Sequence, residues 1–138
     1  MRSSGFRDAL LAGAGLALLN LALWRLGISQ LVIVHWPLLV ITTLVYVQIG
    51  RREGRRGSTG AGVLGMMTGF VPGLLAGVPM TAAVFHDPAV TAGLAHPPTE
   101  AIYLLTLGLG LLGSTLYGGL VAYLFGRPLP QPTEDGRD

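Results

Sequence analysis

The stretch GAGVLGMMTGFVPGLLAGVP, residues 60–79, lies at the centre of an uncharged run from Gly57 to His86. This run of 30 residues exceeds the roughly 20 that an α-helix needs to cross the hydrocarbon core of a bilayer. Glycine recurs at every fourth position within it, the spacing that lets two membrane helices approach closely. The stretch therefore predicts a transmembrane helix with a packing face of glycines.

Three further segments have the same character. Residues 9–24, 26–50 and 101–126 carry no charged side chain, and the first is long enough if Arg25 extends towards the headgroups. We expect an all-α integral membrane protein that folds as a compact bundle of four transmembrane helices, near residues 8–26, 28–50, 60–85 and 100–126. Residues 1–126 would form this domain, and residues 127–138 a disordered cytoplasmic tail.

The composition excludes several other classes of protein. Hydrophobic residues make up 51% of the 138 residues, glycine contributes 21 more, and charged residues make up only 12%. A soluble domain this small has too little interior to bury so much apolar surface, and disordered or nucleic-acid-binding chains carry more charge. The absence of cysteine excludes disulfides and thiol chemistry.

The arginines predict the orientation in the membrane. Four of the nine lie in the segment 51–56, and short loops rich in arginine stay in the cytoplasm. With four crossings, both termini are then cytoplasmic, and eight of the nine arginines lie on that side. We expect a multi-pass protein of the cell membrane, with no cleaved signal peptide because no small-residue cleavage site follows the first apolar run.

Two rows of small residues predict a seam between the third and fourth helices. The first row is Gly65, Gly69, Gly73 and Gly77, and the second is Thr106, Gly110, Ser114 and Gly118. Because these helices run antiparallel, we expect the pairs Gly65–Gly118, Gly69–Ser114, Gly73–Gly110 and Gly77–Thr106. The same glycines could instead face a second copy of the chain.

Few polar side chains lie inside the expected helices. Asn20 and His35 are at about the same depth on neighbouring helices, so we expect a mutual hydrogen bond in the membrane. Pro72 and Pro79 interrupt the third helix, and we interpret them as a static kink rather than a hinge.

No group of residues has the pattern of a catalytic, cofactor or metal site. His86, Asp87, His96 and Glu100 are metal-capable, but their spacing matches no zinc motif. We therefore expect no enzymatic activity and a structural, accessory or scaffolding role. We expect the protein to contact the lipid bilayer and to assemble as a homo-oligomer or within a larger membrane complex, and we expect no nucleic-acid partner. The alternative is a small channel or solute transporter, with the two helix-three prolines as a hinge and Asn20, His35 and Thr68 along its path.

Overall fold

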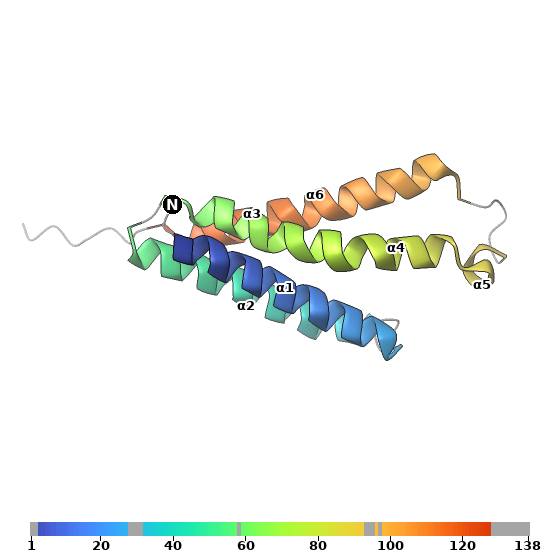
Figure 1. Ribbon diagram of the computed structural model, residues 1–138, viewed down its shortest axis with the longest axis horizontal. Helices are drawn as coiled ribbons and strands as arrows, with labels where there is room; N and C mark the ends of the chain where they lie inside the picture. Colours follow the sequence, from blue (N-terminus) through green and yellow to red (C-terminus); the bar gives the residue numbers. More distant parts are fainter. Residues whose placement is uncertain (1–2, 28–31, 58, 93–95, 97, 128–138) are drawn as a thin grey trace, which may run out of the picture.

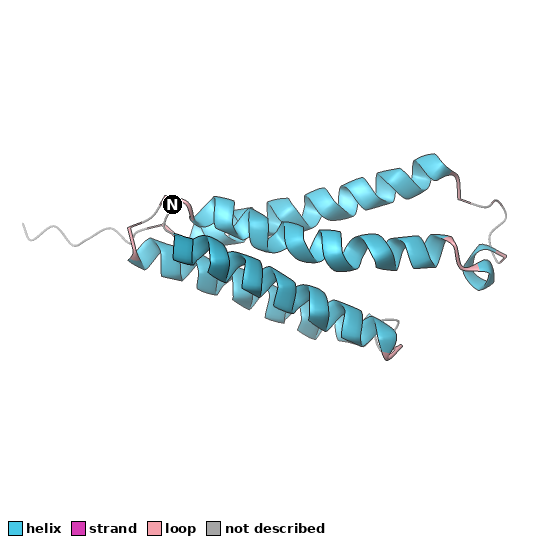
Figure 2. Ribbon diagram, in the orientation of Figure 1, coloured by secondary structure: helices cyan, strands magenta, loops and turns pink. Residues whose placement is uncertain are grey.

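The computed structural model describes residues 3–27, 32–57, 59–92, 96 and 98–127, and every regular element among them is helical (Figure 2). Four helices, counting α3, η2 and α4 as one, are long and apolar enough to cross a membrane. The expected four-helix, all-helical fold is confirmed for these residues. The elements are α1 (Ser3–Arg25), α2 (Val32–Arg55), α3 (Ala61–Pro72), the π-helix η2 (Gly73–Gly77), α4 (Val78–Phe85), the short α5 (Pro88–Thr91) and α6 (Glu100–Phe125).

The helix boundaries extend beyond the apolar runs. α1 begins at Ser3 rather than near residue 8, and α2 continues to Arg55 rather than ending near residue 50. Arginine and glutamate are good helix formers, so the backbone continues as helix after the apolar run has ended. α2 stops where Gly57 adopts a φ of 64°. The start expected for the second helix, residues 28–31, and the tail from residue 128 lie outside the described residues.

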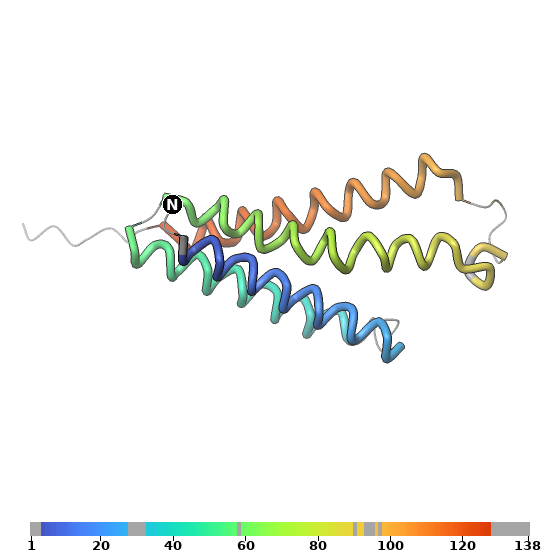
Figure 3. Tube along the Cα trace, in the orientation of Figure 1, coloured from blue at the N-terminus to red at the C-terminus, as the bar shows by residue number. Residues whose placement is uncertain are grey.

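The four long helices converge at one end of the bundle and separate at the other (Figure 1). The start of α1, the end of α2, the start of α3 and the end of α6 meet at what we call the closed end. At the opposite, open end, α1 and α2 diverge from α4 and α6, as the trace in Figure 3 shows. α3 packs most extensively against α6, α1 packs mainly against α3, and α2 packs mainly against α6.

Glycines hold α3 against α6 at the closed end. A β-carbon built on Gly65 would strike the carbonyl oxygen of Gly118, and one built on Gly69 would strike the carbonyl oxygen of Ser114. The structure thus brings together the two pairs expected for this half of the seam. Such close approach adds dispersion and Cα–H···O contacts that a larger side chain would prevent.

The expected pairs in the other half of the seam do not form, and this corrects the sequence-based register. A β-carbon on Gly73 would meet Leu111 and Ser114 rather than Gly110, which has open space beside it. Gly77 has only its own helix, at Pro72, within reach, so it does not pack on Thr106. η2 begins at Gly73, and because its wider turn takes up an extra residue, the residues that follow are rotated by about 100° relative to a regular helix.

α6 is also packed against α2 through glycines, a contact that we did not predict. β-carbons on Gly50 and Gly54 would strike the backbone of Ala122 and Gly126 respectively. Ala122 is completely buried as a result. The spacing of these two glycines is the detectable signal, but Gly50 was placed at the end of the expected helix and Gly54 within the arginine-rich segment that was interpreted as a loop. The buried core beside this contact consists of Leu16, Tyr46 and Val121.

Candidate functional site

A cavity of about 480 Å³ lies between the two diverging parts of the bundle. Its walls come from α1, α2, η2, α4 and α6, so it occupies the space that opens where the helices separate. Apolar side chains such as Leu38 and Met80 make up much of the surface. The polar side chains in the walls are uncharged or imidazole groups: Asn20, His35, Thr42, Tyr46, Thr81, Thr106, Ser114 and Tyr117.

A second cavity of about 250 Å³ continues the first towards the open end. The two share Asn20, His35, Leu38 and Met80, and the second adds Trp24 near the end of α1 and Val84 near the end of α4. We call the two together the cleft. The cleft therefore runs from the middle of the bundle to the ends of α1 and α4.

Two tyrosines close the cleft at its inner limit. The Tyr46 ring is 1% exposed and meets the Tyr117 ring edge-on, with the ring centroids 5.9 Å apart. The hydroxyl groups of Tyr117 and Thr43 are 2.7 Å apart and share a hydrogen bond. Tyr46 in turn packs beside the backbone of Gly118, so the seam and the cleft floor are parts of one rigid unit. The cleft therefore ends at these two rings on the side of the closed end.

Some hydroxyl groups in the cleft have a hydrogen-bond partner within their own helix, and others do not. Thr106 donates to the carbonyl of Ile102 at 2.8 Å, and Ser114 donates to that of Leu111 at 3.1 Å, so both hydroxyls are bonded within α6. Thr42 and Thr81 also line the cleft, and neither hydroxyl has a hydrogen-bond partner among the residues that the structure describes. These two hydroxyls are available to a bound molecule.

Asn20 and His35 both lie in the walls of the cleft, in both of its cavities. The Asn20 amide nitrogen donates to the carbonyl of Leu16 at 2.8 Å, one turn earlier in its own helix. The structure therefore brings the expected polar pair to one site, and a hydrogen bond between the two side chains stays a prediction.

Several small residues of the seam expected between the third and fourth helices lie in the wall of the larger cavity. Gly73, Gly77, Thr106, Gly110 and Ser114 all line the larger cavity. Beyond η2 a β-carbon on Gly77 or Gly110 would meet no atom of another helix, whereas Gly73 lines the cavity while still packing against Leu111 and Ser114. Small residues thus close the bundle at one end and make room for the cleft in the middle.

Thr68 does not lie along any path, contrary to its place in the alternative transporter hypothesis. It is completely buried and donates to the carbonyl of Leu64 at 2.8 Å and to that of Ala9 at 3.3 Å. Pro72 removes the usual donor to the Thr68 carbonyl, which instead faces Gly13 of α1. This residue joins α3 to α1 and belongs to the packed interior.

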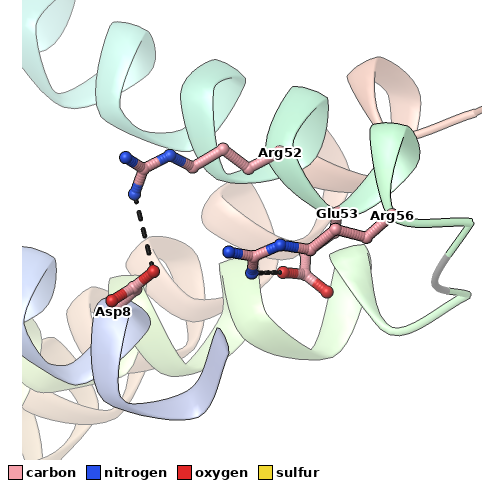
Figure 4. Close-up of polar contacts among 4 residues, drawn as sticks. All are labelled: Asp8, Arg52, Glu53 and Arg56. Atoms are coloured by element: carbon pink, nitrogen blue, oxygen red, sulfur yellow. Dashed lines mark hydrogen bonds and ion pairs between the residues drawn. The ribbon is translucent and has the colours of Figure 1, made fainter. Parts of the chain in front are cut away.

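An ionic cluster lies at the closed end (Figure 4). Arg56 donates to the Glu53 carboxylate at 2.8 Å, and Arg52 donates to Asp8 of α1 at 3.5 Å. Glu53 is only 7% exposed, and its carboxylate lies against Gly5 in the first turns of α1. Sequence reasoning missed this cluster because it ended the second helix near residue 50, before Arg52, Glu53 and Arg56.

Two of the metal-capable residues near the open end, His86 and Asp87, make local structural contacts. Asp87 caps α5 by accepting from the backbone nitrogen of Ala89 at 2.8 Å, and a ring nitrogen of His86 lies 2.8 Å from the carbonyl of Ala82. Within the described ranges no three histidine, cysteine or acidic side chains gather as a metal site would need.

Comparison with protein-family models, with curated proteins and with solved structures finds no match for this chain. Its function is therefore inferred from its own residues and their contacts.

Proposed function

We propose that this protein is a multi-pass integral membrane protein with a structural, accessory or scaffolding role. The outward faces of its helices support membrane insertion, because large apolar side chains cover them. On α6, Leu104, Leu109 and Leu116 are each about 60% exposed, a pattern that continues along the helix. Contiguous apolar surface of this extent is unfavourable in water and favourable against lipid.

In the proposed orientation the closed end lies in the cytoplasm of a cell-membrane protein. The arginines of α2 and the ion pairs of Figure 4 are at this end, as the preference of arginine for cytoplasmic segments requires. Both chain termini are then cytoplasmic. The open end of the cleft faces the opposite leaflet.

The observation that supports a scaffolding role is the glycine-mediated packing at the closed end. There α6 is held between α2 and α3 by backbone-to-backbone contacts at Gly50, Gly65 and Gly69. Such contacts give a rigid platform that presents the apolar outer faces in a fixed arrangement. A platform of this kind suits assembly with a further membrane protein or with a second copy.

Purification of the tagged full-length chain from its native membrane in mild detergent tests this role. We expect a second membrane protein, or a second copy of this chain, to co-purify at a fixed ratio and to resist washing. Recovery of the monomer alone, under conditions that preserve other membrane complexes of the same cells, would contradict the proposal.

A second candidate function is that of a small solute transporter, and the cleft favours it. The cleft reaches from the open end to the tyrosine floor, next to Pro72 and a π-helix, and interrupted helices of this kind line the sites of several transporter folds. Uptake of small uncharged solutes into proteoliposomes tests it. A flux that Tyr46→Ala increases would support a closed gate at that position, whereas permeability equal to that of empty liposomes would exclude transport of those solutes.

A further inference from the structure

We propose that the cleft binds a neutral membrane lipid whose head carries hydroxyl and carbonyl groups, as in a diacylglycerol. The inference rests on the proposed membrane insertion but not on the scaffolding role. A lipid bound here would place its head among the polar residues of the larger cavity and its acyl chains along the opening between the two helix pairs.

The volume of the larger cavity is that of a site for a small molecule. Ligand cavities usually measure about 300–1,000 Å³, and the larger cavity holds about 480 Å³. A lipid head and the first carbons of its chains are molecules of the size that such a cavity takes.

The chemistry of the walls selects an uncharged head group. Among the described residues no acidic side chain, arginine or lysine lines either cavity, so an ionised head would lose its hydration without gaining a counter-ion from them. Among the residues that the structure describes, the hydroxyls of Thr42 and Thr81 have no hydrogen-bond partner, and the Asn20 amide oxygen accepts no hydrogen bond. These groups match the carbonyl and hydroxyl groups of a neutral glycerolipid.

The wall beside these hydroxyls is the irregular part of the third helix. Gly73, Ala76 and Gly77 of η2 line the larger cavity directly, one turn before Thr81. π-helical turns are rare and are found frequently at functional sites, because the widened turn costs stability. Here the turn separates α4 from the α6 seam and thereby creates the space that a lipid would fill.

Tryptophan fluorescence of the reconstituted full-length chain provides the test. The chain has two tryptophans, and Trp24 lines the cleft whereas Trp36 is exposed on α2. In a Trp36→Phe background, Trp24 alone reports on the cleft. The probes are a diacylglycerol, a phosphatidylglycerol and an alkane, each carrying bromine, which quenches tryptophan on close approach.

We expect the brominated diacylglycerol to quench Trp24 saturably and the other two probes to quench it only in proportion to their concentration in the bilayer. Thr42→Val and Thr81→Val should each weaken the saturable binding about 5-fold, the effect of losing one neutral hydrogen bond. Thr115→Val is the matched control, because that hydroxyl lies outside the cleft and donates to the carbonyl of Leu111 at 2.7 Å.

Three results would overturn the inference. They are quenching by diacylglycerol that does not saturate, saturation by the alkane or the anionic lipid to the same extent, and a Thr42→Val/Thr81→Val double variant with unchanged affinity. None of these bears on the co-purification test, so a failure of lipid binding and a failure of the scaffolding proposal are distinguishable.

Discussion

Replacement of Gly69 by alanine tests the close packing on which the closed end depends. The new β-carbon would overlap the carbonyl oxygen of Ser114, and a carbon–oxygen contact needs about 3.3 Å or more. α3 and α6 would have to move apart by roughly 1 Å, and overpacking of this kind typically costs about 1–3 kcal/mol. Alanine also favours the helix over glycine by about 0.5–1 kcal/mol. We expect a net loss of about 1–2 kcal/mol in the free energy of unfolding.

Gly110→Ala is the matched control, because it makes the same change in a partner helix where a β-carbon meets nothing within 4 Å. Only the helix-propensity gain applies there, so we expect this variant to be more stable than the wild type by about 0.5–1 kcal/mol. Unfolding in mixed micelles of increasing denaturing-detergent fraction, followed by circular dichroism, measures both. The reasoning is refuted if Gly69→Ala is as stable as Gly110→Ala.

Three further predictions concern orientation and polar contacts. Reporter fusions at residues 54 and 92 should score cytoplasmic and external respectively, because arginine-rich segments stay inside, and the reverse pattern would invert the proposed topology. Glu53→Gln should lower the free energy of unfolding by about 1 kcal/mol, because the buried acceptor of Arg56 loses its charge. Asp8→Asn, at the more exposed ion pair with Arg52, should change the free energy of unfolding by less than about 0.5 kcal/mol. Equal effects of the two variants would show that burial does not strengthen the Glu53 pair. A double-mutant cycle of Asn20→Leu and His35→Leu should give a coupling of about 0.6–2 kcal/mol if the two side chains share a hydrogen bond, and additive effects would exclude it.

The ionic cluster at the closed end illustrates why helix ends escaped the sequence-based interpretation. Hydropathy locates the apolar part of a helix, but the backbone continues as helix while its residues favour that conformation. α2 therefore includes Arg51, Arg52, Glu53 and Arg55, and Asp8 lies in the second turn of α1 rather than at its start. Pairing of residues 44 positions apart depends on how α1 and α2 lie together, which no local pattern encodes.

The sequence by itself determined the number of long helices, their approximate positions and the closed half of the seam. Long uncharged apolar runs have few alternatives to helix, and glycine at every fourth position marks a face for close approach whatever the partner. The pairs Gly65–Gly118 and Gly69–Ser114 followed from antiparallel helices and a constant rise per residue.

Only the tertiary structure decided where the seam ends and what lies beyond it. The π-turn at Gly73–Gly77 rotates the following residues, so Gly77 and Gly110 line a cleft instead of packing on their expected partners. The turn lies between α3, which packs on α6, and α4, which diverges from it, so the partners that it gains or loses are set by helices distant in sequence. Asn20, His35, Thr42 and Thr81 share one cleft for the same reason, because the rotation and separation of four helices together set which side chains face one another.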